Sequence, residues 1–168
     1  MKKNYITDPQ LLVTLSGIYF LLYMVQYNDN FSIFNGGNFP NFMLISTIIT
    51  GMFLGDKMGS VFGFFIGAFM DAVAFDTICF NSIFMLLCGY FCGVLVATYL
   101  NNNFKTSLIL STVISFIYYF TRVCINGFDL ELFRYDYIKS IFLTIVFSIP
   151  LYAIINLIIK QRKKKLSR

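Results

Sequence analysis

The chain has 168 residues, of which 58% are hydrophobic and only 12% are charged, and its formal net charge at pH 7 is +5. Soluble domains carry about 25% charged residues, so this chain has too little polar surface to cover a water-soluble fold of its size. The composition predicts an integral membrane protein, in which lipid replaces water over most of the exterior.

The first expected element is a membrane-spanning helix at residues 11–27. This apolar run follows two lysines, as in a secretory signal sequence, but large aromatic side chains occupy the region where a small-residue cleavage site would lie. We therefore expect a retained first span. A polar, glycine-rich loop follows it and ends at Pro40, a residue well suited to the first turn of the next helix.

The next apolar stretch, residues 41–75, is too long for one span. Its 35 residues would form a helix of about 52 Å at 1.5 Å per residue, whereas the hydrocarbon core is about 30 Å thick. Asp56 and Lys57 lie near its middle and offer the only plausible turn. The stretch is therefore expected to form a short second span at 41–55 and a third span at 58–75.

Three further spans complete the expected bundle. The fourth is expected at residues 82–100, with Asn81 placed to cap its start, and the fifth at 107–124. The sixth, at 138–159, contains Pro150, which should kink it. The sequence thus predicts an all-α, single-domain bundle of six transmembrane helices with a basic tail at 160–168.

Lysine and arginine collect on one side of these six spans. One side would hold ten basic residues, and the other would hold Arg122, Arg134 and Lys139. Because cytoplasmic loops carry an excess of lysine and arginine, both termini are expected in the cytoplasm. The tail is interpreted as a topology anchor on anionic lipid headgroups, with a cytoplasmic protein contact as the alternative. The ten are Lys2, Lys3, Lys57, Lys105 and the six basic residues from Lys160 to Arg168.

Small residues recur at intervals of four in the middle spans. Residues four apart lie on nearly one face of a helix, and small residues let helix backbones approach closely in lipid. The second, third and fourth spans are therefore expected to form a tightly packed centre and a partner interface, whereas the other three are bulkier. The residues are Gly51 and Gly55 in the second span, Gly59, Gly63 and Gly67 in the third, and Gly89, Gly93 and Ala97 in the fourth.

Asp71 is an acid inside the third span, near the C-terminal end of the helix, where a negative charge is disfavoured. Intramembrane acids usually face the bundle interior or a cavity and have a partner. Arg122, at the outer end of the fifth span, lies at a matching depth. We expect either that Asp71 pairs with Arg122 or that Asp71 reaches the outer headgroups.

The residue types present do not indicate catalysis. The chain has no histidine, which excludes Ser-His intramembrane proteolysis and most metal sites. Phe53 stands where an aspartyl intramembrane protease would need a second glycine before Gly55 and Asp56. We expect no enzyme activity, cofactor, metal or nucleic-acid partner, and a proton-coupled carrier remains an alternative. Four cysteines without zinc spacing should act as small apolar residues: Cys79, Cys88, Cys92 and Cys124.

From Pro40 to Ala97, the order of "PNFMLI", the glycine series, "GAFMDA" and "NSIFMLLCGYFCG" resembles the MreD family of bacterial rod shape-determining proteins. Asn41 departs from the family's usual aspartate, which puts a role for charge at that position in doubt. The resemblance covers about 60 residues. The positions that match are Pro40, Gly55, Gly63, Gly67, Asp71, Asn81, Gly89, Tyr90 and Gly93.

This resemblance implies a non-catalytic scaffold of the cell-elongation machinery in the bacterial plasma membrane. The implied direct partner is MreC, a single-span protein whose bulk lies outside the membrane. The filament protein MreB, the glycan polymerase RodA and a class B penicillin-binding protein would be partners in a larger peptidoglycan-synthesis complex.

The alternative is the substrate-binding S component of an energy-coupling factor vitamin transporter, whose fold is thought to be akin to that of the MreD family. Such proteins dock through small residues, often alanines four apart, and Ala68 and Ala72 have that spacing, although on the third span. A vitamin pocket should be lined by polar side chains near the outer loops. The candidates are Asp29, Asn30, Asn35, Asn38, Asp76, Asn126 and Asp129.

Overall fold

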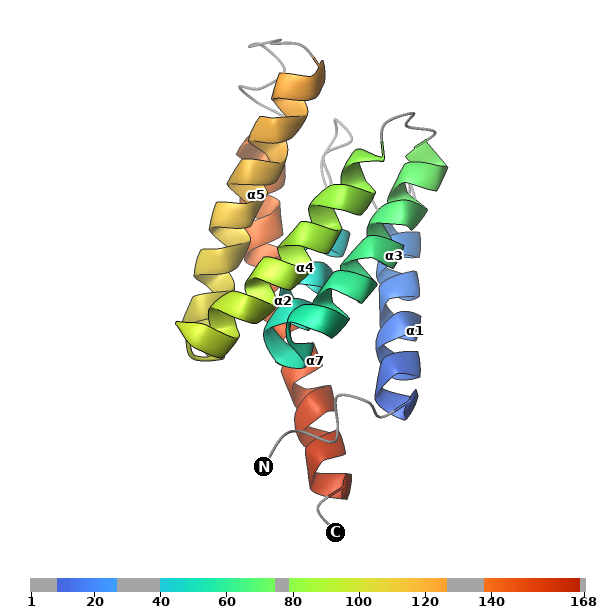
Figure 1. Cartoon of the computed structure of the whole chain (residues 1–168), viewed down its shortest axis with the longest axis vertical. Helices are drawn as coiled ribbons and strands as arrows, with labels where there is room; N and C mark the ends of the chain where they lie inside the picture. The colour runs from blue at the N-terminus through green and yellow to red at the C-terminus, as the bar shows by residue number, and fades with distance from the viewer. Residues whose placement is uncertain (1–8, 27–39, 75–78, 127–137, 167–168) are drawn as a thin grey trace.

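The computed structural model describes residues 9–26, 40–74, 79–126 and 138–166, and in these ranges the chain is a bundle of α-helices (Figure 1). The expected all-α architecture is confirmed, and most helix ends lie within three residues of those expected. The largest difference is at the last helix, which continues through most of the basic tail. The helices are α1 (Pro9–Gln26), α2 (Phe42–Leu54), α3 (Asp56–Ala74), α4 (Phe80–Thr98), α5 (Phe104–Asn126) and α7 (Ile138–Leu166).

Four of the described helices, α1, α4, α5 and α7, are long and apolar enough to cross a membrane. The outside of the bundle carries large apolar side chains, including Val13 at 71% exposure and Phe65 and Phe142 at 67% each. Exposed large apolar side chains lie on each of the four helices that could cross a membrane, which is typical of a surface that faces lipid. The bundle is therefore a membrane-embedded protein whose exterior faces hydrocarbon.

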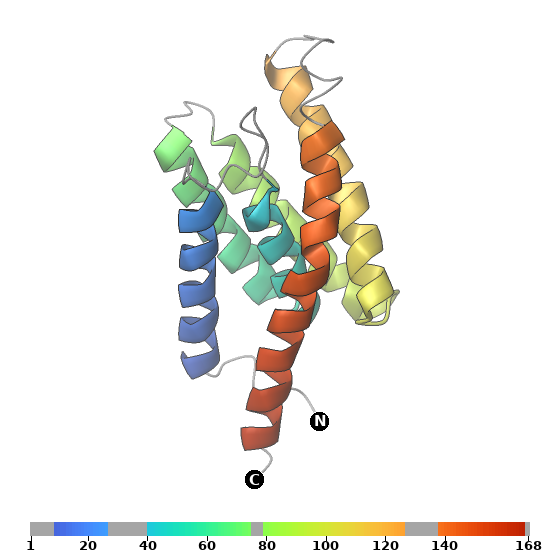
Figure 2. The same cartoon turned by 180° about the vertical axis from the view of Figure 1, so that it is seen from behind.

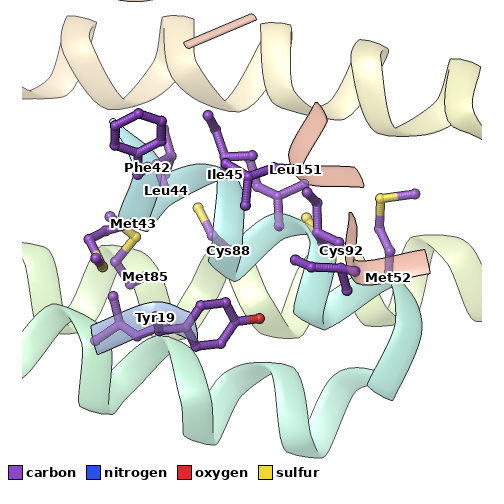
Figure 3. Close-up of a cluster of buried hydrophobic side chains, with 14 of the residues drawn as sticks. Tyr19, Phe42, Met43, Leu44, Ile45, Met52, Met85, Cys88, Cys92 and Leu151 are labelled. Atoms are coloured by element: carbon purple, nitrogen blue, oxygen red, sulfur yellow. The ribbon is translucent and has the colours of Figure 1, made fainter. Parts of the chain in front are cut away.

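The short helix α2 lies at the centre of the bundle. All of its 13 residues are buried, and it contacts α1, α3, α4, α5 and α7. Figure 3 shows Phe42, Leu44 and Ile45 of α2 beside Cys88 of α4 and Leu151 of α7. A helix that is apolar on every side can be enclosed in such a core or can face lipid, and the contacts of α2 place it in the core. Because protein covers α2, its length of about 20 Å is not a mismatch with the surrounding lipid.

Basic residues gather at one end of the bundle, which we call the lower end because it lies at the bottom of Figures 1 and 2. The start of α1, the connections α2–α3 and α4–α5, and the end of α7 all lie there. Lys57, Lys105 and the basic stretch of α7 from Lys160 to Lys165 therefore share this end. Arg122 and Lys139 lie at the opposite end, so the charge asymmetry expected from the sequence is present along the bundle axis.

The turn between α2 and α3 lies at Gly55, not at Asp56 and Lys57 as expected. Gly55 ends α2 with φ +91° and ψ −178°, a conformation that is essentially restricted to glycine. Asp56 is already the first residue of α3. Its carboxylate is favourable there, because the N-terminal end of a helix carries a partial positive charge. The two charged residues therefore begin the third helix and do not form the turn.

The helices α5 and α7 pack along each other, and both bury small hydroxyl residues four apart. They were expected to be bulky, and this expectation was wrong for their buried faces. Thr144 links the pair to the core, because its Oγ1 accepts a hydrogen bond of 3.1 Å from the backbone N–H of Asn41, next to α2. The residues are Ser107, Ser111 and Ser115 on α5 and Ser140, Thr144 and Ser148 on α7.

Candidate functional site

The close approach of α3 and α4 depends on glycine. A Cβ atom added at Gly63 would lie within 3.0 Å of backbone atoms of Met85, and one added at Gly67 would meet the backbone of Asn81 at a similarly short distance. Each step of four residues forward on α3 matches a step of four backward on α4. The two helices therefore form an antiparallel pair in which backbone contacts backbone, as expected from the spacing.

The same contact extends to α2 through one glycine from each helix. A Cβ on Gly51 would lie 2.5 Å from the carbonyl oxygen of Gly89, and a Cβ on Gly59 would lie 2.6 Å from Cα of Gly51. Gly93 meets the backbone of Asp56 in the same way. In hydrocarbon there is no hydrophobic drive between helices, so such van der Waals contact is a main source of cohesion. The second, third and fourth helices thus form one tightly packed unit.

At two positions of the expected small-residue series, this contact does not require a small side chain. Gly55 has open space around an added Cβ, and its glycine is required by the positive φ of the turn. Ala97 is exposed. At this end of the bundle α2 ends and α3 begins beside Gly93, so Ala97, one turn further along α4, lies past the turn that joins them.

Asp71 is the best-connected polar residue of this unit. It is 6% exposed, and its Oδ1 accepts hydrogen bonds from the backbone N–H of Asn81 at 3.1 Å and from Asn81 Nδ2 at 2.8 Å. Its Oδ2 accepts from the backbone N–H of Ser82 at 2.8 Å and from Ser82 Oγ. A carboxylate has about four lone-pair sites, so the hydrogen-bonding capacity of Asp71 is filled.

This geometry explains why an acid is stable near the C-terminal end of α3. Asn81 and Ser82 are the second and third residues of α4, and their N–H groups have no partner within that helix. Asp71 caps α4 from a neighbouring helix and places its charge at the positive end of the α4 dipole. Asn81 was expected to cap α4 itself. That expectation was wrong, because Asn81 lies inside the helix and Cys79 is at the cap position.

Arg122 reaches Asp71 only through other residues. Arg122 Nη1 donates to Tyr118 Oη at 3.0 Å, and Tyr118 Oη donates to Asn81 Oδ1 at 2.7 Å. The Arg122 guanidinium also lies 6.0 Å from the centre of the Tyr118 ring. The direct Asp71–Arg122 pair that the sequence suggested is therefore replaced by a relay, in which Tyr118 and Asn81 join α5 to the capped start of α4. Asp71 does not reach the headgroups either, because it is buried.

Sequence reasoning missed Ser82 and Tyr118. Tyr118 is 1% exposed and packs its ring against Phe84, 5.1 Å between centroids, and Phe80, 5.7 Å. Its position four residues before Arg122 on one helix face was the available signal, because residues at that spacing meet. Ser82 carried no such signal, since its role follows from where α3 ends.

The remaining residues of the family resemblance have separate positions. Pro40 precedes the helix, and Asn41 caps α2, with its Oδ1 accepting from the N–H of Leu44 at 3.0 Å. The sequence suggested that Pro40 lies in the first turn of α2, but the helix begins at Phe42, two residues later. An asparagine at position 41 supplies the cap without a charge. Tyr90 lies on the outward face of α4 and is 43% exposed.

A lateral groove of about 500 Å³ opens between α1 and α3, with Met43 of α2 at its base. Tyr23 and Phe69 meet across it with ring centroids 4.5 Å apart, as do Tyr19 and Phe62 at 6.0 Å. The groove is therefore aromatic and suited to apolar occupants. Its walls are Ser16, Tyr19, Phe20 and Tyr23 of α1 and Val61, Phe62, Phe65, Ile66 and Phe69 of α3.

Gly17, beside Ser16 on the exposed face of α1, differs from the glycines of the packed centre. A Cβ added to it meets nothing within 4 Å. Glycine costs a helix interior about 1 kcal/mol relative to alanine. The other helical glycines of the described residues offset this cost by contacts inside the bundle, whereas Gly17 makes no such contact.

The described residues contain no group of three or more His, Cys, Asp or Glu side chains that could hold a metal ion. Cys88 and Cys92 are buried and pack as small apolar residues beside α2 (Figure 3). The polar residues suggested for a vitamin pocket lie outside the described residues, except Asn126, which is the last residue of α5.

Comparison of the chain with protein-family models, with curated protein sequences and with solved structures finds no significant match.

Proposed function

We propose that this chain is a non-catalytic membrane scaffold that binds the transmembrane helix of a partner protein, in the manner of the MreD family that its sequence resembles. The observation that carries this proposal is the role of Asp71. An acid inside the membrane usually marks a transport or catalytic site. Here every oxygen of the carboxylate is engaged in capping α4, so its chemistry serves the packing of the bundle.

The proposed docking surface is the outward face of α1 together with the lateral groove. Gly17 supports this choice, because a partner helix that packed against it would offset the cost of a glycine that has no contact within the chain. The neighbouring groove would accept large side chains of the partner among Phe20, Phe65 and Phe69. On this proposal the partner is MreC, and MreB, RodA and a class B penicillin-binding protein join the larger elongation complex.

We further propose six passes through the bacterial plasma membrane, with both termini in the cytoplasm. The gathering of basic residues at the lower end, where α1 begins and α7 ends, supports this topology. The helix α2 would cross as a core helix surrounded by protein, and α3 would cross with the charge of Asp71 stabilised by the capping hydrogen bonds.

Affinity capture from bacterial membranes tests the proposal, with Gly17→Leu compared with the parent protein. Since the chain leaves space at Gly17, the substitution should leave the fold intact and reduce recovery of an MreC-like protein at least tenfold. Ala97→Leu is the matched control, because Ala97 is also exposed but lies on α4 at the lower end. Depletion of the protein should turn rod-shaped cells round.

One result would reject the proposed docking surface, and another would reject the scaffold. Recovery of the partner in equal amounts with Gly17→Leu would remove the proposed surface. Unchanged cell shape together with nanomolar vitamin binding by the purified protein would favour the transporter S component.

A further inference from the structure

A second groove lies at the lower end of the bundle, between the first turns of α1 and the end of α7. Its volume is about 360 Å³, and its walls are Pro9, Gln10, Val13 and Thr14 of α1 and Arg162 of α7. It therefore combines an apolar wall with one cationic side chain. It is separate from the packed centre and from the lateral groove between α1 and α3.

The guanidinium of Arg162 uses one of its N–H donors within the described residues. Its Nη1 donates to Gln10 Oε1 at 2.6 Å, and this is the one hydrogen bond of its side chain within the described residues. A guanidinium carries five N–H donors in a planar fork that matches phosphate oxygens. Within the part of the chain that the structure describes, the other four donors make no hydrogen bond, while the Gln10 contact fixes the orientation of the fork.

The groove lies at the level of the lipid headgroups. The helix α7 has 29 residues and is about 44 Å long, which exceeds the hydrocarbon core of about 30 Å. Its apolar segment ends at Ile159, and Lys160 begins the basic segment. Arg162 therefore lies just beyond the hydrocarbon, and Gln10, bonded to it, lies at the same depth. Val13, 71% exposed, is one turn nearer the membrane centre.

The charge of the groove favours an anion. Neither α1 nor α7 contains an aspartate or a glutamate, and the last turns of α7 carry five basic residues between Lys160 and Leu166. The acid nearest in sequence, Asp8, lies outside the described residues. Basic pockets between helices at the cytoplasmic surface are suited to anionic headgroups.

We propose that this groove binds one anionic glycerophospholipid, with the phosphate on the free donors of Arg162 and the first acyl carbons against Val13 and Pro9. The lipid would bridge α1 and α7, which are the first and last of the described helices. Only the choice of the cytoplasmic leaflet rests on the proposed topology. The phosphate site itself depends on depth and charge, so it can hold even if the partner protein is another one.

Native mass spectrometry of the full chain tests this site, with phosphatidylglycerol or phosphatidylcholine added to the detergent micelles. The parent should retain one phosphatidylglycerol at least tenfold more strongly than phosphatidylcholine. Arg162→Gln should abolish this preference. Arg162→Lys keeps the positive charge but should still lose most of the preference for phosphatidylglycerol, because lysine lacks the planar fork of donors. Lys164→Gln is the matched control, because Lys164 is exposed and does not line the groove. It should change retention by less than twofold.

Three results would overturn the proposal. Equal losses with Arg162→Gln and Lys164→Gln would mean diffuse attraction of the basic helix to anionic lipid. Displacement of phosphatidylglycerol by millimolar inorganic phosphate would mean a site for a free anion. Retention unchanged by Arg162→Gln, with the variant folded, would remove Arg162 from the site. Because capture of the partner protein is a separate measurement, none of these outcomes bears on the scaffold.

Discussion

The contact between α3 and α4 at Gly63 determines whether an alanine at this position stabilises or destabilises the bundle. In Gly63→Ala the new Cβ would lie 2.8 Å from the carbonyl carbon of Met85 and 3.0 Å from Cγ2 of Thr47. Carbon atoms prefer separations of about 3.5–4.0 Å, so the helices would have to move apart by roughly 1 Å. Overpacking of this kind costs about 1–3 kcal/mol, and the better helix propensity of alanine returns about 1 kcal/mol.

The overpacking cost at Gly63 should lie in the upper part of its range, because the obstructing atoms of Met85 belong to the backbone and cannot rotate away. The expected net loss for Gly63→Ala is about 1–2 kcal/mol in the free energy of unfolding. The matched control is Gly17→Ala, where a Cβ meets nothing within 4 Å. It should stabilise the bundle by up to about 1 kcal/mol, so the same substitution should have opposite signs at the two positions.

The buried thiols of Cys88 and Cys92 give the assay. In a background of Cys79→Ser and Cys124→Ser, which removes the two exposed thiols, maleimide labelling in micelles follows opening of the bundle. Gly63→Ala should raise the labelling rate about 5- to 30-fold. The Gly17→Ala variant should label more slowly than the parent. Equal rates for the parent and Gly63→Ala would refute the argument from backbone contact.

Three other substitutions test other parts of the structure, each by unfolding in increasing dodecyl sulfate followed by circular dichroism. Asp71→Ala should lower the free energy of unfolding by about 3 kcal/mol, because it leaves four buried donors without their acceptor. Exchanging the charges of Asp71 and Arg122 should not restore stability, and recovery by the exchange would mean a direct pair. Gly55→Ala should lose about 1–3 kcal/mol despite the open space, because φ is +91°; no loss would show that the turn tolerates a side chain. Thr144→Val should lose about 1–2 kcal/mol by removing the acceptor of the Asn41 N–H, and a neutral result would mean that another group takes this hydrogen bond.

Most helix boundaries followed from the sequence, because the hydrocarbon core sets the length of an apolar helix and polar residues mark its ends. The glycines at 59, 63, 67, 89 and 93 were likewise identified as a packing face, since a spacing of four needs only the helix period to be interpreted. The sequence did not reveal that α2 is enclosed by protein, because a helix apolar on all sides can face lipid or core.

The roles of single residues were decided by tertiary structure. Asp71 appeared to be in a poor position when only its own helix was considered, and it became a cap because the antiparallel register of α3 and α4 brings the start of α4 to its carboxylate. Ala97 continues the spacing of Gly93 but is exposed, because the turn that joins α2 to α3 lies one helical turn earlier, beside Gly93. Spacing along one helix fixes which residues share a face, whereas the neighbour of that face depends on where the other helices begin, end and cross.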